Sequence, residues 1–275
     1  MTQEKDLMPI RAITFDLWLT LIWDSKELEE YRRLRRLINF GRFTSKVSSN
    51  GTGPNRIAFE EIRVAMETMT TKVKRLYEQG YDVSPGDRGR MLFKLLKINV
   101  PKQDSEEIYE RAGKILSNAG YFSKYPNINP EALPTFKLLK ERFPDLKIGL
   151  VSNAARSSET YRRMFSRFGL EKYFDGFIIS CEVGFLKPRK EIFEKALSLL
   201  GAKPKEALHV GDLFRADVIG AVSAGMNACL YTGLWHKYAQ YMNPGEHLPQ
   251  NFKSRTLVEE ISKLQDSAKV AQRVA

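Results

Sequence analysis

Long hydrophobic runs are missing from this 275-residue sequence, and cysteine is rare. No stretch reaches the roughly 18 consecutive apolar residues that a membrane-spanning helix needs. Residues 1–10 lack the basic segment followed by an apolar one that marks a secretory signal. The two cysteines, Cys181 and Cys229, stand in apolar surroundings without the spacing of a metal site. We therefore expect no membrane partner, a cytoplasmic location and two reduced, buried thiols.

Positive charge exceeds negative charge along the chain. Lysine and arginine number 44 against 33 for aspartate and glutamate, which gives a formal net charge of +11. Such an excess attracts anions and speeds their arrival. Nucleic acid, an anionic membrane surface and small phosphorylated molecules all fit this charge, so charge alone does not choose among them.

The first hundred residues after Asp24 have a helical pattern with no strand between the helices. We predict a first helix whose apolar face holds Leu28, Tyr31, Leu34 and Ile38. Its arginines are expected mostly on the other faces, namely Arg32, Arg33, Arg35 and Arg36. Residues 41–55 are rich in Ser, Gly and Asn and predict a loop. Further helices are predicted at 59–77, 88–97 and 104–118, which together suggest a four-helix bundle.

The rest of the chain alternates strands with helices. Strands are predicted at 12–15, 147–151, 174–179, 207–210 and 227–231, with helices near 129–143, 157–168, 191–200 and 216–224. This alternation predicts a parallel sheet in a Rossmann-like three-layer α/β sandwich. We expect residues 1–23 and 126–275 to form this domain and residues 24–125 to form the inserted helical bundle. The last twenty residues are polar and predicted to be a frayed helix.

Polar side chains follow the predicted strands where each one stops, at Asp16, Ser152, Ser180 and Asp212. In an open parallel sheet, ligands bind beyond the carboxyl ends of the strands. A polar residue that recurs at this position therefore predicts a functional site at one edge of the sheet. His209 lies inside an apolar strand instead, and we interpret it as a hydrogen-bonded core histidine.

Four motifs resemble those of the haloacid dehalogenase superfamily, in the same order and with similar spacing. The first is Phe15-Asp16-Leu17-Trp18-Leu19-Thr20-Leu21, where the superfamily usually has Asp-x-Asp-x-Thr. The others are Val151-Ser152-Asn153, Lys187-Pro188, and His209-Val210-Gly211-Asp212 with Asp217 five residues later. The resemblance covers nearly the whole chain. It also implies that the inserted helices form a cap over the site.

The resemblance implies a Mg²⁺-dependent hydrolase that acts on a small phosphorylated substrate. Asp16 would be the nucleophile that forms an aspartyl-phosphate, which splits one difficult step into two. Mg²⁺ would be held by Asp16, Asp212 and the backbone carbonyl of Trp18. Lys187 would neutralise charge in the transition state, and Asp217 would orient Lys187 or reach the metal through water. The phosphoryl group would be bound by Lys187 and by Thr20, Ser152 and Asn153.

The sequence departs from the superfamily pattern at Trp18. Phosphatases of this type have a second aspartate there, which protonates the leaving oxygen and later activates water; tryptophan can do neither. Such general acid–base help is worth about 10²–10⁴-fold in rate. We therefore expect a substrate with a good leaving group, such as an anhydride, acyl phosphate or aryl phosphate, or a proton supplied by the cap. Leu19 also stands where glycine is frequent.

Two alternatives remain. Superfamily members that remove halide from 2-haloacids have tyrosine at the Trp18 position and use no metal. Their fourth motif resembles Ser-Ser-Asn, however, whereas Asp212 beside Asp16 without a metal would place two like charges together. The second alternative is a non-catalytic member that binds a nucleotide, nucleic acid or protein through the arginines of the first helix, although a solvated helix face explains those arginines more simply. The sequence allows a monomer or a homodimer.

Overall fold

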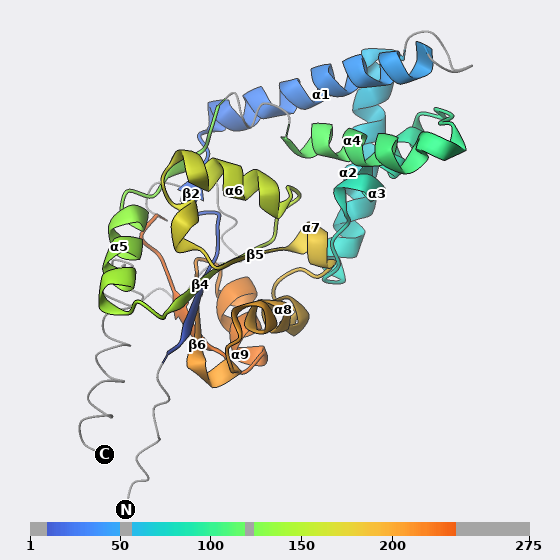
Figure 1. The fold of residues 1–275 in the computed structure, drawn as a ribbon. Helices are drawn as coiled ribbons and strands as arrows, with labels where there is room; N and C mark the ends of the chain where they lie inside the picture. The colour runs from blue at the N-terminus through green and yellow to red at the C-terminus, as the bar shows by residue number, and fades with distance from the viewer. Residues whose placement is uncertain (1–9, 50–56, 119–123, 235–275) are drawn as a thin grey trace, which may run out of the picture.

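A five-stranded parallel sheet forms the centre of the computed structural model, which describes residues 10–49, 57–118 and 124–234 (Figure 1). The strand order is β5-β4-β1-β6-β7. The strands are β1 (Ala12–Phe15), β4 (Lys147–Ser152), β5 (Gly176–Ile179), β6 (Ala207–Gly211) and β7 (Asn227–Leu230). Each was predicted from its apolar run, and the parallel α/β sandwich is confirmed. The predicted C-terminal helix lies outside the described residues.

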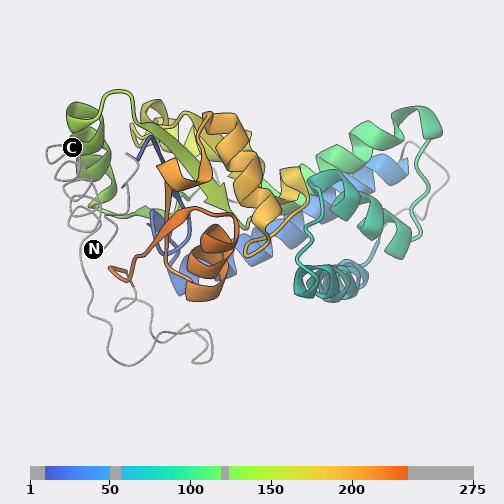
Figure 2. The same cartoon turned by 90° about the horizontal axis from the view of Figure 1, so that it is seen from below.

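Helices cover both faces of this sheet (Figures 1 and 2). The alternation of side chains along β1 sends Ile13 and Phe15 to one face and Ala12 to the other. The first face packs against α5 (Ala132–Arg142) and α6 (Ser158–Arg167). The second packs against α8 (Lys190–Leu200) and α9 (Gly220–Ser223). The shorter elements of this part are α7 (Ser180–Val183), the 3₁₀ helices η2 (Glu171–Tyr173) and η3 (Pro204–Glu206), and the π-helical η4 (Phe214–Ile219).

The helices described between residues 26 and 118 form a separate group with a hydrophobic core of its own. The helices are α1 (Lys26–Ser49), α2 (Phe59–Glu78), α3 (Pro85–Leu95), the 3₁₀ helix η1 (Lys102–Asp104) and α4 (Ser105–Asn118). Figure 1 shows α1 running from the sheet to the far end of this group. A short antiparallel ribbon of β2 (Ile22–Trp23) and β3 (Asn127–Ile128) closes the base of the insertion. The domain limits at residues 24 and 125 remain a prediction.

The loop predicted at residues 41–55 is wrong over its first part, because α1 continues to Ser49. Phe40, Phe43 and Thr44 are buried, so packing fixes this stretch as helix despite its composition. The hydroxyls of Thr44 and Ser45 donate to the carbonyl of Gly41, at 3.1 and 2.9 Å. These polar side chains therefore bond within the helix instead of ending it.

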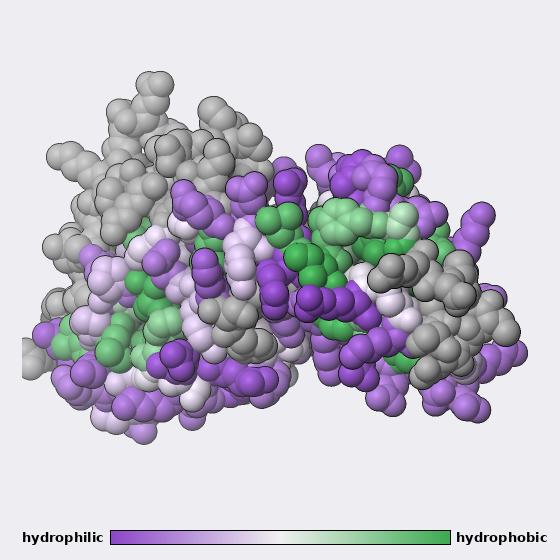
Figure 3. Space-filling model, turned by 90° about the horizontal axis from the view of Figure 1, so that it is seen from above, coloured by the Kyte–Doolittle hydropathy of each residue, from purple (hydrophilic) through white to green (hydrophobic). Residues whose placement is uncertain are grey.

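The apolar face predicted for the first helix is wrong in part. Leu28 is buried and Tyr31 half-buried, but Leu34 and Ile38 are exposed. The inward stripe follows a spacing of four residues: Leu28, Arg32, Arg36, Phe40 and Thr44. The reason is the buried ion pair of Arg32 with Asp24, to which the Lys124 carbonyl adds a hydrogen bond at 3.1 Å. Figure 3 shows hydrophobic side chains exposed on the part of the molecule that the inserted helices form. Among the described helices, none combines the length and apolar character needed to cross a membrane.

Replacing Phe40 with alanine is expected to lower the free energy of unfolding by about 3–5 kcal/mol, because the change empties a filled core position. Leu34→Ala, on the same helix, is the matched control. It should change stability by less than about 0.5 kcal/mol, since the Leu34 side chain is already half in solvent. Urea denaturation of both variants checks the face assignment. Equal losses would contradict it.

Candidate active site

The parallel strands bring the predicted residues of motifs one, two and four to one edge of the sheet. Asp16 follows β1, Ser152 ends β4 and Asp212 follows β6. The Asp16 amide donates to the Val210 carbonyl at 2.8 Å, which fixes the end of β1 against the end of β6. Carboxylate oxygens of Asp16, Asp212 and Asp217 lie within 4.8 Å of one another, and all three residues are buried.

Lys187 lies in the middle of this acidic group and is itself buried. Its ammonium donates to Asp16 and, at 2.6 Å, to Asp217. The backbone of Lys187 is held by Asn153, whose Oδ1 accepts from the Lys187 amide at 2.8 Å and whose Nδ2 donates to the Lys187 carbonyl at 3.0 Å. Asn153 was predicted to contact substrate. Its side chain bonds to the lysine backbone at both ends, and a contact with substrate stays a prediction.

Asp217 accepts three hydrogen bonds from protein donors. Besides Lys187, it accepts from His209 Nε2 at 3.0 Å and from the Leu213 amide at 2.8 Å. His209 Nδ1 in turn accepts from the Thr14 hydroxyl at 2.8 Å, across the register pair that joins β1 to β6. This buried histidine is therefore hydrogen-bonded, as predicted. The sequence did not reveal that it supports Asp217.

Gly211 is required by the close approach of Asp217. A Cβ atom built at residue 211 would lie 2.2 Å from the Asp217 carboxyl carbon, which no real side chain allows. The glycine of the Gly-Asp motif thus leaves room for the carboxylate that orients Lys187.

One lysine does not balance the three carboxylates. Burial is the main reason that the pKa of Asp16 rises to about 6; Lys187 lowers this pKa and Asp217 raises it. Burial, together with Asp16 and Asp217, raises the pKa of Asp212 well above its ordinary value. Burial also acts to raise the pKa of Asp217, but Lys187 and His209 outweigh it and hold that pKa low. Asp16 and Asp212 therefore need a further positive charge if both are to be ionised at neutral pH.

Two buried hydroxyls of the predicted site have no hydrogen-bond partner within the described residues. They belong to Thr20 and Ser152. Thr20 lies on a tight turn in which the amides of Leu21 and Ile22 both donate to the Leu17 carbonyl, at 2.9 and 3.0 Å. Buried polar groups are normally paired, so two unpaired hydroxyls beside a nucleophile candidate indicate a place for a ligand with acceptor oxygens.

The same turn places Leu19 in the left-handed region, with φ of 57°. That conformation costs an ordinary residue about 1–2 kcal/mol, which explains why glycine is frequent at this position in similar motifs. Trp18, just before it, is half-buried and lines a pocket of about 330 Å³ together with Leu19 and Trp23. The other residues that line this pocket are Asp24, Arg156 and three residues of α1, namely Glu29, Arg32 and Arg36.

The inserted helices also contact the segment that leads to Lys187. The Asp82 carboxylate accepts from Ser180, one of the polar strand-end residues noted in the sequence, and pairs with Arg88 at 2.7 Å. The Asp82 amide donates to the Gly184 carbonyl at 3.0 Å, and Tyr81 forms an antiparallel bridge with Phe185. These contacts fix the turn between α2 and α3 on residues 180–186.

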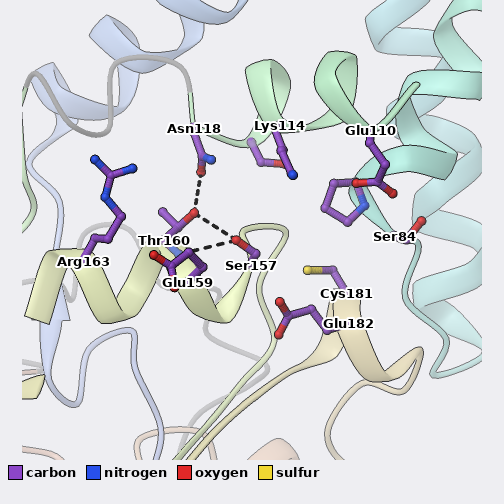
Figure 4. Close-up of a pocket in the computed structure, with 12 residues that line it drawn as sticks. Ser84, Glu110, Lys114, Asn118, Ser157, Glu159, Thr160, Arg163, Cys181 and Glu182 are labelled. Carbon is purple, nitrogen blue, oxygen red and sulfur yellow. Dashed lines mark hydrogen bonds between the residues drawn. The ribbon is translucent and has the colours of Figure 1, made fainter. Parts of the chain in front are cut away.

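A cavity of about 580 Å³ lies between α3, α4, α6 and α7, away from the predicted catalytic residues (Figure 4). Asn118, Thr160 and Ser157 form a hydrogen-bonded chain on one wall. Cys181 lies on the other, and burial raises the pKa of its thiol to about 12. Cys181 and Cys229 are both buried, as predicted, and neither forms a disulfide within the described residues. The high pKa disfavours the reactive thiolate form of Cys181.

The family profile of haloacid dehalogenase-like hydrolases matches residues 10–225. The chain belongs to the haloacid dehalogenase-like hydrolase family. A glyceraldehyde 3-phosphate phosphatase of Methanothermobacter thermautotrophicus is 30% identical over 143 residues, which cover 52% of this chain and 60% of that enzyme. The match therefore spans less than two thirds of that relative. A glyceraldehyde 3-phosphate phosphatase of Methanopyrus kandleri is 28% identical over 219 residues, covering 79% of this chain and 82% of the relative.

Among solved structures, a 2-haloacid dehalogenase from Pseudomonas syringae pv. Tomato has a TM-score of 0.56 with 18% sequence identity. The alignment covers 94% of this chain and 99% of that one. At this identity the similarity establishes the haloacid dehalogenase-like fold alone. The residues of the site must distinguish the reactions that the fold supports.

Replacing Lys187 with methionine is expected to lower the free energy of unfolding by about 3–5 kcal/mol in buffer without divalent cations, because three buried carboxylates lose their central cation. Lys147→Met is the matched control, since the Lys147 ion pair with Asp175 is exposed. That variant should unfold at nearly the wild-type urea concentration. If the two variants are equally stable, the charge balance assigned to Lys187 is wrong.

Proposed function

We propose that this hydrolase is a Mg²⁺-dependent phosphatase that acts on a small phosphorylated substrate through an aspartyl-phosphate at Asp16. The observation that supports it most is the cluster of Asp16, Asp212 and Asp217 around Lys187, beside the unpaired hydroxyls of Thr20 and Ser152. Carboxylates suit a hard cation, and hydroxyls with a lysine suit phosphoryl oxygens. The phosphatase names of the relatives agree with this substrate class.

Each residue of the site has its own role in the proposed reaction. A carboxylate oxygen of Asp16 attacks phosphorus, and the bond from phosphorus to the leaving oxygen breaks. Water then cleaves the aspartyl-phosphate, which releases inorganic phosphate and restores the carboxylate. Thr20 and Ser152 donate hydrogen bonds to the phosphoryl oxygens, while Lys187 offsets the charge that builds on them. Asp217 holds Lys187 in place and is a positioning residue.

The donor set fits Mg²⁺. Asp16 and Asp212 offer carboxylate oxygens, Trp18 offers its backbone carbonyl, and Mg²⁺ prefers one or two carboxylates together with phosphate oxygens and water. Three buried carboxylates gathered around a single lysine support this assignment, together with the raised pKa of Asp212. When bound, the ion would neutralise the phosphoryl group and allow both carboxylates to be ionised. Asp217 would reach it only through water, since its oxygens already accept from protein donors.

The inserted helices are proposed to act as the cap of this site. They contact the Lys187 segment through Asp82, and the start of α1 forms one wall of the pocket beside Trp18. A cap in this place excludes bulk water and contacts the leaving group.

A panel of phosphate esters and anhydrides tests the proposal, with Mg²⁺ present or removed by a chelator. We expect phosphate release only with Mg²⁺, and a loss of at least about 10³-fold in kcat for Asp16→Asn, which removes the nucleophile. Mg²⁺ should also raise the Tm of the wild type but not that of Asp212→Asn, because only the wild type keeps the ligand set. Chloride release from a 2-chloroacid in chelator, without phosphate release, would show a dehalogenase instead.

Replacing Trp18 with aspartate should restore general acid–base help. We expect the rate on alkyl phosphates to rise about 10²–10⁴-fold, and the rate on aryl phosphates to rise much less, because their leaving groups need no proton. Trp18→Leu is the control, since leucine removes the indole and adds no acid. The account of Trp18 fails if a folded Trp18→Asp enzyme gains nothing on alkyl phosphates.

A further inference from the structure

The pocket beside Trp18 is the feature that the proposed reaction leaves unexplained. Trp18 lies two positions after Asp16 in the sequence, and three arginines also line the pocket: Arg32, Arg36 and Arg156. Its volume of about 330 Å³ lies at the lower end of the range for small-molecule sites. Arg36 and Arg156 also line a second cavity of about 760 Å³, which extends between α1, α2 and α4. The two arginines thus lie where both cavities meet.

The three arginines differ in how far acidic groups balance them. Arg32 is buried and paired with Asp24, so its charge is matched inside the protein. Glu29, the other carboxylate of the pocket wall, is exposed at the rim. Arg36 is half-buried, and its guanidinium donates to the backbone carbonyl of Arg32 at 3.4 Å. Burial lowers the pKa of Arg36, and the positive charge of Arg156 lowers it further. The guanidinium groups of Arg36 and Arg156 therefore place two like charges beside the same small pocket.

The inward stripe of α1 holds two arginines between buried apolar side chains. Leu28 and Phe40 bury apolar surface on this stripe, whereas Arg32 and Arg36 turn cationic side chains inward between them. The ion pair with Asp24 accounts for the inward position of Arg32. Arg36 has no carboxylate at ion-pair distance in the described structure, so its inward position gains most from an anion that arrives from outside.

We propose that Arg36 and Arg156 bind a second anionic group of the substrate, so that the preferred substrates are phosphoesters that also contain a carboxylate or another phosphate. This inference rests on the proposed phosphatase function. Trp18 and Trp23 form the apolar wall along which the carbon skeleton between the two anionic groups lies. Two arginines in one concave wall match a compact anion better than a nucleic-acid backbone, which would need outward-facing cations along a surface.

Paired substrates test the inference, because each pair differs only by a carboxylate. The pairs are aryl phosphates, whose leaving groups need no proton: 4-carboxyphenyl phosphate with phenyl phosphate, and 4-(carboxymethyl)phenyl phosphate with 4-methylphenyl phosphate. In at least one pair, the wild type should favour the carboxylated compound by about 10-fold or more in kcat/KM, as a charge-assisted contact to arginine allows. Arg36→Met and Arg156→Met should bring this ratio close to one. Arg42→Met, at an exposed arginine of the same helix that lines neither cavity, should keep the wild-type ratio.

Binding to the Asp16→Asn protein separates this inference from the proposed function. The affinities of both members of each pair are measured by calorimetry, with and without Arg36→Met. The anion subsite is supported if the carboxylated member binds more tightly and Arg36→Met abolishes this preference. This holds even if the wild type hydrolyses neither compound. In that case only the proposed phosphatase function fails. Turnover of both members with a wild-type ratio near one overturns the subsite and leaves the phosphatase. Equal binding of the pair, with an oligonucleotide retained through Arg36, also overturns it and assigns the arginine to nucleic acid.

Discussion

The ammonium of Lys187, buried between Asp16 and Asp217, is the interaction on which the rest of the site depends. An unpaired lysine or carboxylate at this depth would cost several kcal/mol. The pairing in turn requires Asn153 at the end of β4, Asp217 after β6, and the chain from His209 to Thr14 across β6 and β1. The register of three neighbouring strands therefore fixes one charge balance. That balance remains incomplete at Asp212, and this is the physical argument for a divalent cation.

Sequence reasoning found the strands and the strand-end residues because both depend on local rules. An apolar run of four or five residues forms a buried strand, and parallel strands place their carboxyl ends at one edge. The same reasoning failed for part of α1, where it placed Leu34 and Ile38 inside and Arg32 outside. Arg32 is instead buried by contacts with Asp24 and with the carbonyl of Lys124, which lie outside the helix and are invisible to periodicity. The role of His209 was missed because periodicity does not show that η4 brings the Asp217 carboxylate, eight residues later in the chain, to Nε2 of His209.

Trp18 is the departure that bears most on the proposed reaction. In that reaction a carboxylate at this position would face the leaving group, whereas the indole contributes apolar surface to the pocket that Arg36 and Arg156 also line. Without proton transfer, the proposed reaction would be restricted to leaving groups that depart as anions. An aromatic side chain in a pocket with two arginines would favour substrates whose leaving group is itself charged and partly apolar. Under the proposed function both consequences would restrict the substrates in the same direction, so the substitution would select among phosphoesters rather than disable the site.

The insertion and the catalytic lysine do not move independently. The turn between α2 and α3 bonds to residues 180–186 through Asp82 and through the bridge of Tyr81 with Phe185, and Lys187 follows directly. The guanidinium of Arg189, two residues beyond the lysine, lies 4.4 Å from the centre of the Tyr81 ring. A further attachment joins α4 to α6, where the Thr160 hydroxyl donates to the Asn118 side chain at 3.2 Å. A displacement of the helices must therefore break these polar contacts or carry the segment before Lys187 along. In the proposed reaction, access to the pocket and the position of Lys187 would be coupled by the same few hydrogen bonds.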